Sequence, residues 1–381
     1  MKKYLKFSVC GLTTILLLVT NAFSQSDSVK SKPVIIGYVA GFRGLINTDK
    51  IAAQKLTHIN YAFVNVKGNS AFLGNLKTDT VNFRKLNLLK QKNPDLKIFI
   101  SIGGWAWSEN FSDAVLTDSS RAEFAQSSVD IIRKYNLDGV DIDWEYPARP
   151  GEEGNVYRPE DKQNFTLMFQ AIRKELDVLQ KETGQKKLLS TAVGGFTDFL
   201  NTSEMGKAQQ YLDYVNLMTY DLYTGGGTAS HHANLYDSKK IASNSSADKT
   251  IKAFIAAGVP ANKLVMGIAF YGRNFKIDES GKKGLGDKVV SGQFGKGYTL
   301  LKDSLINKNG YKRFVDKGAK APYLFNEKNK TFITYEDEQS VKNKCKYVKE
   351  HGLAGVMFWE YSSDPKEYLL DEINKRLANR L

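Results

Sequence analysis

Three acidic residues recur at every second position of one short apolar stretch, which reads Asp-Gly-Val-Asp-Ile-Asp-Trp-Glu over residues 138–145. Alternate side chains of a β-strand point to the same face, so Asp141, Asp143 and Glu145 share one face of this stretch. Like charges ~6–7 Å apart along a strand cannot all ionise easily, which raises the pKa of at least one carboxyl group. A carboxyl group that keeps its proton near neutral pH can act as a general acid.

A metal site and a purely structural role are the alternatives for these acids. Residues 138–145 contain no histidine, and the four histidines of the chain, His58, His231, His232 and His351, are not spaced as ligands to this segment. A structural role is disfavoured because buried, unpaired carboxylates are costly. The pattern therefore favours acid–base catalysis, and we expect neither a metal nor a cofactor. For His231 and His232 we expect a structural role or a place at the rim of a substrate site.

The elements that must position these acids alternate along the chain. Nearly continuous apolar runs, typical of parallel strands covered on both faces, are separated by amphipathic stretches such as residues 119–135 and 161–182. The runs cover residues 34–39, 58–64, 97–102, 139–143, 188–193, 214–219, 264–270 and 355–358. Eight such runs predict an α/β protein with a (β/α)8 TIM barrel, in which the acids face the interior near the C-terminal mouth.

One interval of about sixty residues lacks a parallel-strand pattern, and a structureless loop of that length is improbable in a compact domain. We therefore expect a small α+β insertion at residues 274–333, after the seventh strand, and a catalytic barrel formed by residues 33–273 and 334–381. The first strand is not followed by Gly-x-Gly-x-x-Gly, which argues against dinucleotide binding.

The N-terminus predicts export. Lysines at positions 2, 3 and 6, an apolar stretch over residues 9–19 and small residues near position 24 are typical of a signal peptide, here residues 1–24, before a polar lead-in at 25–32. We expect a secreted or periplasmic protein without a membrane span. Lipidation at Cys10 is less favoured, and cleavage of the signal peptide would leave Cys345 without a partner for a disulfide. The net charge of +13 is scattered, so nucleic acid is not an expected partner, and we expect a monomer.

The carboxylate stretch resembles the Asp-Gly-x-Asp-x-Asp-x-Glu signature of glycoside hydrolase family 18, the chitinases and their relatives. Four further segments resemble motifs of this family in the same order: Ser-Ile-Gly-Gly-Trp at 101–105, Met-Thr-Tyr-Asp at 218–221, Tyr-Gly-Arg at 271–273, and Trp359. The resemblance extends over residues 33–377. It implies a secreted chitinase that hydrolyses β-1,4 bonds of chitin and N-acetylglucosamine oligomers with retention of configuration, and whose larger members carry an insertion after strand seven.

The resemblance also implies roles for individual residues. Glu145 would protonate the glycosidic oxygen, and the 2-acetamido group of the substrate would be the nucleophile. Asp143 would support that group and share a proton with Asp141, while Tyr220 would orient the acetamido carbonyl. The implied substrate-binding residues, which include aromatic rings suited to sugar faces, are Tyr38, Phe63, Gly104, Trp105, Tyr146, Met218, Asp221, Tyr271, Arg273 and Trp359.

Two other functions remain as alternatives. An endo-β-N-acetylglucosaminidase acting on glycoproteins would share the carboxylate motif, but such relatives usually lack the Trp-Glu-Tyr context. A non-catalytic chitin-binding lectin would typically have lost the acid at position 145, which is intact here. The glycine-rich residues 222–228 replace a Trp-bearing loop of many relatives, and Trp107 is an additional aromatic residue, so the preferred chain length stays open.

Overall fold

The computed structural model describes residues 1, 4, 32–242 and 245–378, and its compact unit is Lys32–Leu381. The predicted signal peptide therefore lies outside the described residues, apart from Met1 and Tyr4. Among the helices of the described part, none is both long enough and apolar enough to cross a bilayer.

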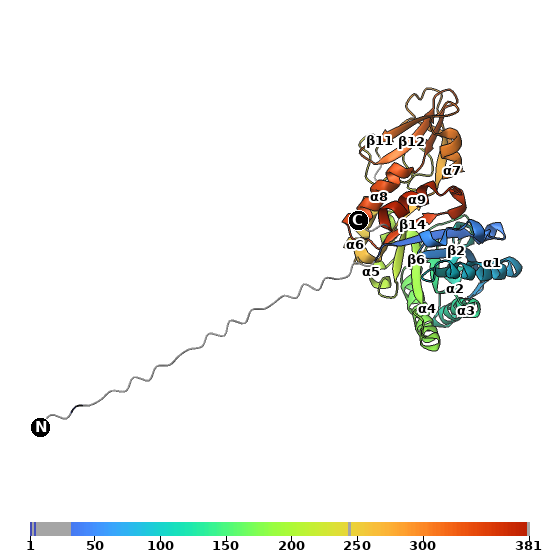
Figure 1. Cartoon of the computed structure of the whole chain (residues 1–381), viewed down its shortest axis with the longest axis vertical. Coiled ribbons are helices and arrows are strands. Elements are labelled where there is room, and N and C mark those ends of the chain that lie inside the picture. Colours follow the sequence, from blue (N-terminus) through green and yellow to red (C-terminus); the bar gives the residue numbers. More distant parts are fainter. Residues whose placement is uncertain (2–3, 5–31, 243–244, 379–381) are drawn as a thin grey trace. The chain divides into compact units, whose positions relative to one another are not determined.

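A closed barrel of eight parallel strands forms the centre of the compact unit (Figure 1). Each strand pairs in parallel with its two neighbours, and pairing of the first strand with both the second and the last closes the ring. The barrel strands are β1 (Val34–Ala40), β2 (His58–Lys67), β4 (Lys97–Gly103), β5 (Gly139–Asp143), β6 (Leu188–Gly194), β7 (Tyr214–Met218), β8 (Leu264–Ala269) and β14 (Gly355–Trp359). This confirms the predicted (β/α)8 barrel.

Helices cover the outside of the barrel and bury the outward face of its strands in one large apolar core. The helix α3 (Asp118–Tyr135) begins with a capping box between Thr117 and Ser120, and Asn136 ends it in the left-handed conformation. The other α-helices of the described part are α1 (Leu76–Leu88), α2 (Phe111–Ala114), α4 (Asp161–Thr183), α5 (Met205–Ala208), α6 (Ala247–Ala256), α7 (Tyr298–Leu300), α8 (Glu338–Glu350) and α9 (Tyr368–Leu377). The predicted helices at 119–135 and 161–182 thus agree closely with α3 and α4.

A second, antiparallel sheet follows β8 and precedes α8. Its strands are β9 (Tyr271–Ile277), β10 (Val289–Gly297), β11 (Lys312–Asp316), β12 (Ala321–Asn326) and β13 (Thr331–Thr334), in the order β10-β9-β13-β12-β11. It has its own small apolar cluster around Phe275, Phe325 and Phe332. This antiparallel sheet lies where an insertion was expected, although β9 begins three residues before position 274; the division into domains stays a prediction.

One further short strand, β3 (Ser70–Phe72), lies outside this sheet and forms a hairpin with β2.

Candidate active site

Asp141 and Asp143 lie in β5, and Glu145 follows its end by two residues. All three are buried, with exposed fractions of 0% for Asp141, 4% for Asp143 and 9% for Glu145. Trp144, between the last two, is 1% exposed and stacks on Phe111 with ring centroids 5.2 Å apart, in the core outside the barrel. The alternation of faces expected from the sequence is therefore present in the folded chain.

Hydrogen bonds from four neighbouring strands hold the carboxyl group of Asp141. Its Oδ2 accepts from Tyr38 Oη at 2.9 Å and Ser101 Oγ at 2.8 Å, while its Oδ1 accepts from Ser190 Oγ at 2.6 Å and Asn216 Nδ2 at 3.2 Å. Burial raises the pKa of Asp141, and the hydrogen bonds from Ser190, Ser101 and Tyr38 oppose that rise. Asp141 therefore lies in the barrel interior, beneath the other two acids, as a fixed polar centre.

The upper two acids hold protons more strongly than ordinary carboxyl groups. Burial raises the pKa of Glu145 to about 7. Burial, followed by the charges of Glu145 and Asp141, raises the pKa of Asp143 well above its usual range. Because the pKa values of both groups are raised, the site holds at least one proton at its mouth near neutral pH. A group with a pKa near 7 can give up a proton and take it back, as general acid–base catalysis requires.

Tyr220 and Asp221 follow β7 at the same mouth. Burial raises the pKa of Tyr220 well above its usual range, and the charges of Asp143 and Glu145 add to the rise, so its hydroxyl is a neutral hydrogen-bond donor. Asp221 has a left-handed backbone (φ 53°), a conformation that is costly for a residue with a side chain and is often found at functional sites. These residues line the cleft together with Asp143 and Glu145.

Arg273 and His232 fix the side chain of Asp221. Arg273 donates from Nε to Oδ1 at 2.7 Å and from Nη2 to Oδ2 at 2.5 Å, and His232 Nδ1 lies 3.4 Å from Oδ1. Burial alone would raise the pKa of Asp221, but the hydrogen bonds from His232 and Arg273 outweigh it and hold that pKa well below its usual range. His232 is fully buried behind Asp221, whereas the buried His231 contacts Asp316 of β11.

A cleft of about 560 Å³ opens above the acids, and twelve of the fourteen residues predicted for the site line it. They are Tyr38, Phe63, Trp105, Asp143, Glu145, Tyr146, Met218, Tyr220, Asp221, Tyr271, Arg273 and Trp359. Asp141 lies below the cleft floor. Gly104 is buried against Phe63, whose ring carbons would lie 2.6 Å from a Cβ at position 104, so it supports the wall from behind.

Phe42 was not predicted, although it forms part of the aromatic floor. Its ring lies nearly parallel to those of Phe63, at 6.1 Å and 6°, and Trp359, at 6.5 Å and 12°. Trp107 completes this cluster at 5.3 Å from Phe42. Phe42 is 45% exposed and follows the end of β1 by two residues. An aromatic residue just after a barrel strand was the signal in the sequence that could have identified it.

Phe294 of β10 is the second aromatic residue that the sequence did not single out. It is 54% exposed, and its ring stacks on Tyr271 at 4.5 Å, with the guanidinium carbon of Arg273 5.2 Å from its centroid. The antiparallel sheet therefore contributes a ring to the cleft. Its position within a glycine-rich segment of irregular pattern gave no signal of where it would point.

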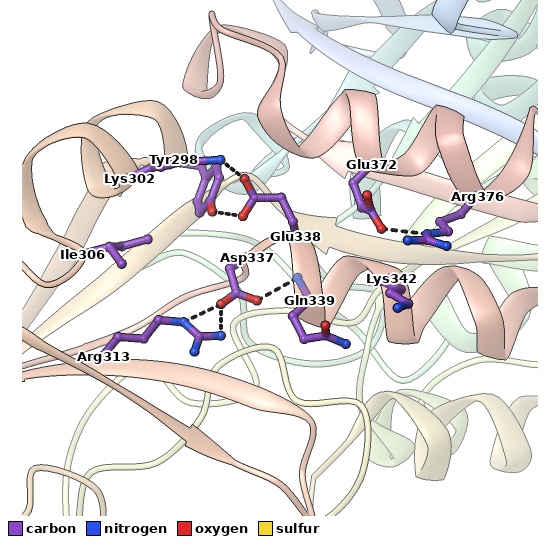
Figure 2. Close-up of a pocket in the computed structure, with 10 residues that line it drawn as sticks. All are labelled: Tyr298, Lys302, Ile306, Arg313, Asp337, Glu338, Gln339, Lys342, Glu372 and Arg376. Atoms are coloured by element: carbon purple, nitrogen blue, oxygen red, sulfur yellow. Dashed lines mark hydrogen bonds and ion pairs between the residues drawn. The ribbon is translucent and has the colours of Figure 1, made fainter.

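Another hollow, of about 420 Å³, lies between the antiparallel sheet and helices α8 and α9 (Figure 2). It is polar, but each of its acids is already bonded to a base: Glu338 to Lys302, Asp337 to Arg313, and Glu372 to Arg376. It therefore offers no free carboxyl group for acid–base work. Within the part of the chain that the structure describes, no group of three or more His, Cys, Asp or Glu residues could hold a metal ion.

Comparisons with known proteins match most of this chain. The family model for glycosyl hydrolases family 18 matches residues 34–364. Chitinase A1 from Niallia circulans is 37% identical, and the match covers all of this chain and 62% of that protein. The structure of a family 18 N-acetylglucosaminidase from Paenibacillus barengoltzii is similar with a TM-score of 0.84 and 41% identity, over 91% of this chain and all of that one. A class V chitinase from Nicotiana tobaccum, solved in complex with NAG4, has a TM-score of 0.82 and 25% identity, over 92% of this chain and all of that one.

Proposed function

This chain belongs to glycosyl hydrolase family 18, and from that premise we propose that it is a chitinase that hydrolyses the β-1,4 bonds of chitin and N-acetylglucosamine oligomers. The observation that carries the proposal is the position of Glu145, whose buried carboxyl group has its pKa raised to about 7 at the base of an aromatic-lined cleft. The family membership and the chitinases among the relatives support the choice of substrate.

In the first step Glu145 donates its proton to the glycosidic oxygen, and the bond from that oxygen to the anomeric carbon breaks. The carbonyl oxygen of the 2-acetamido group attacks the anomeric carbon and forms a cyclic oxazolinium ion. Asp143 accepts a hydrogen bond from the acetamido N–H and stabilises the positive charge, while the neutral Tyr220 hydroxyl donates to the acetamido oxygen. The shorter sugar chain leaves as an alcohol.

In the second step Glu145, now a carboxylate, takes a proton from water. The water oxygen attacks the anomeric carbon from the side that the leaving group vacated, and the oxazolinium ring opens to restore the acetamido group. Two inversions at one carbon give retention of configuration. Asp141, held by its four donors, lies beneath Asp143, and its charge helps to raise the pKa of Asp143.

The aromatic floor of Phe42, Phe63 and Trp359 binds the sugar faces, whose C–H groups pack on rings. Trp105 and Tyr146, which also line the cleft with ring centroids 6.4 Å apart, add further aromatic surface for the sugar. The salt-bridged Asp221 presents carboxylate oxygens to sugar hydroxyl groups near the scissile bond. The apolar contacts with the rings thus provide affinity, and the polar contacts with Asp221 fix the orientation of the sugar.

A product assay tests this proposal directly. The chain should cleave a hexamer of N-acetylglucosamine and release products whose first-formed anomer is β, as followed by NMR. A fully deacetylated chitosan hexamer, which lacks the attacking carbonyl, should resist cleavage. Cleavage of a high-mannose glycopeptide without cleavage of the hexamer would favour the endo-β-N-acetylglucosaminidase alternative, and an initial α-anomer would overturn the mechanism.

The release of single N-acetylglucosamine units is a second candidate activity. The observation in its favour is the similarity to the N-acetylglucosaminidase from Paenibacillus barengoltzii, which extends over the whole of that chain. The sizes of the first products from the hexamer distinguish the two activities, because release of single units would give monomer and pentamer first, whereas cleavage of internal bonds would give dimer, trimer and tetramer.

We also propose that residues 1–24 direct export and that the mature protein is a monomer. The N-terminal sequence of protein recovered outside the cytoplasm should begin close to Gln25. Light scattering of the purified protein should give the mass of one chain.

A further inference from the structure

Glu145 lies beyond the end of the strand ladder that carries the other two acids. Pairing of β5 with β4 ends at Asp143, opposite Gly103, and its pairing with β6 ends at Ile142, opposite Thr191. The backbone N–H and C=O of Glu145 therefore have no partners in the sheet. Buried backbone groups without partners are costly, so other parts of the chain must bond them.

The hydroxyl group of Ser108 bonds the N–H. It accepts from the Glu145 backbone N–H at 3.0 Å, and it donates to the Gly104 carbonyl at 2.9 Å and lies 3.3 Å from the Asp143 carbonyl oxygen. Ser108 has an exposed fraction of 0%, so no water competes for these bonds. One hydroxyl thus joins the turn after β4 to the residue that carries the catalytic proton.

The amide group of Asn155 bonds the C=O. Its Nδ2 donates to the Glu145 carbonyl oxygen at 3.1 Å. The chain between them folds tightly onto the same carbonyl, because a Cβ at Gly151 would lie 1.9 Å from that oxygen. Only glycine permits this approach, which places Asn155 within bonding distance.

We propose that Ser108 and Asn155 are positioning residues that clamp the backbone of Glu145 from its two sides and fix the direction of its carboxyl group. Neither residue belongs to the lining of the cleft. The clamp replaces the missing strand pairing with two side-chain hydrogen bonds. This inference rests on the proposed function, because it concerns how the catalytic acid of that reaction is held. Misplacement of a catalytic group by about 1 Å can cost about 100-fold in rate.

Two variants each remove one side of the clamp. Ser108→Ala removes the hydroxyl group from a buried site. Asn155→Asp keeps the shape of the side chain but replaces the donor by an oxygen that faces the Glu145 carbonyl. Matched controls make the same changes elsewhere: Ser128→Ala removes a fully buried hydroxyl bonded to the Phe124 carbonyl, and Asn87→Asp alters an amide that donates to the Tyr135 carbonyl at 2.8 Å.

On an N-acetylglucosamine oligomer, each clamp variant should lower kcat about 10- to 100-fold with KM changed less than about twofold, because substrate binding does not depend on the clamp. In Ser108→Ala, which adds no charge, the basic limb of the kcat–pH profile should also move to lower pH, since a loosened Glu145 gains contact with water. The two control variants should leave kcat and its pH profile unchanged.

Asn155→Asp, on a half-buried loop, keeps the inference testable if Ser108→Ala does not fold. An unchanged kcat in a folded clamp variant, or an equal loss of kcat in its control, would overturn the clamp. An inactive wild-type chain would instead overturn the proposed function, so the two failures are distinguishable.

Discussion

The barrel and the antiparallel sheet differ in net charge and in where their acidic residues are buried. Residues 33–273 and 334–381, which contain the barrel, include 36 basic and 34 acidic residues, a net charge of +2. Residues 274–333, which contain most of the antiparallel sheet, include 13 basic and six acidic residues, a net charge of +7. The barrel nevertheless holds the unusual acids, because it buries Asp141, Asp143 and Glu145 in one small volume. The raised pKa values of these acids therefore depend on burial and on neighbouring groups, not on the net charge of the region that contains them.

The two regions also differ in how they are held. The barrel has a continuous ladder and a large apolar core, while the sheet has a small core of its own and is joined to α8 by the pairs Lys302–Glu338 and Arg313–Asp337 (Figure 2). A change in the barrel should therefore alter the chemical step. A change in the sheet should alter the binding of longer substrates, or stability by a small amount.

The largest effect should come from the acid. Glu145→Gln retains size and hydrogen bonding but cannot deliver a proton, so kcat on chitooligosaccharides should fall about 10²–10⁴-fold while oligomer binding survives. Single-turnover kinetics and calorimetric titration with the oligomer measure the two quantities. Glu327→Gln, which removes an exposed acid of the sheet, is the control and should leave both unchanged. A Glu145→Gln rate above a tenth of the wild-type rate would exclude Glu145 as the acid.

The same substitution should increase stability at neutral pH. The pKa of Glu145 is raised from an ordinary 4.5 to about 7, so between these values the folded state binds more protons than the unfolded state, and the free energy of unfolding falls as pH rises. Because glutamine does not ionise, Glu145→Gln removes this fall in the free energy of unfolding. The gain should be on the order of 1–3 kcal/mol above pH 7 and should vanish below pH 4.5. Urea unfolding of both proteins at a series of pH values measures it, and a gain independent of pH would show that the raised pKa of Glu145 is not its cause.

A change in the edge strand β10 of the sheet should have an intermediate effect. Phe294→Ala removes the ring that stacks on Tyr271, so kcat/KM on the hexamer should fall about 3- to 10-fold, as expected for loss of one stacked ring. On an activated disaccharide, which is too short to use every contact of the cleft, the loss should be smaller. The exposed Phe314 of β11 lies outside the cleft lining, and Phe314→Ala is the matched control. Equal losses on both substrates would mean that the sheet does not form a wall of the cleft.

The sequence predicted the barrel well because its strands are buried on both faces. Runs such as 139–143 are apolar except where they carry the acids, and the observed β5 has the same bounds. The motif residues could be placed because barrel strands all present their C-terminal ends at one mouth. Phe42 and Phe294 could not be placed in this way, since the direction of a ring in a loop or edge strand depends on contacts with residues distant in sequence.

The hydrogen bonds of Ser108 and Asn155 to the backbone of Glu145 could not be predicted from the sequence either. Ser108 and Asn155 are ordinary polar residues in loops, and no local pattern distinguishes them from solvent-exposed neighbours. Their importance depends on which loop residues reach the backbone of Glu145, and these contacts join residues 37 and 10 positions apart in the sequence. The buried His232 is a similar case, because its contact with Asp221 depends on how the loop after β7 folds back.

The smallest effect should come from the ion pairs that join the sheet to the barrel. Arg313 donates to Asp337 from Nε at 2.9 Å, but its side chain is 28% exposed, so the pair contributes at most about 1 kcal/mol. Asp337 would keep its bonds to the backbone N–H groups of Gln339 and Ser340 at the start of α8 without Arg313. Arg313→Gln should therefore lower the melting temperature by only about 1–4 °C, with kcat unchanged on the disaccharide and the hexamer. Because salt screens partly exposed pairs, the difference in melting temperature should shrink in 1 M NaCl.

The control is Lys317→Gln. Lys317 is an exposed lysine just after β11 with no ion pair to the described residues, so its replacement should have no effect at either salt concentration. A large loss of hexamer cleavage in Arg313→Gln would mean that these ion pairs set the position of the cleft wall, and that the sheet and the barrel are less independent than their separate cores suggest.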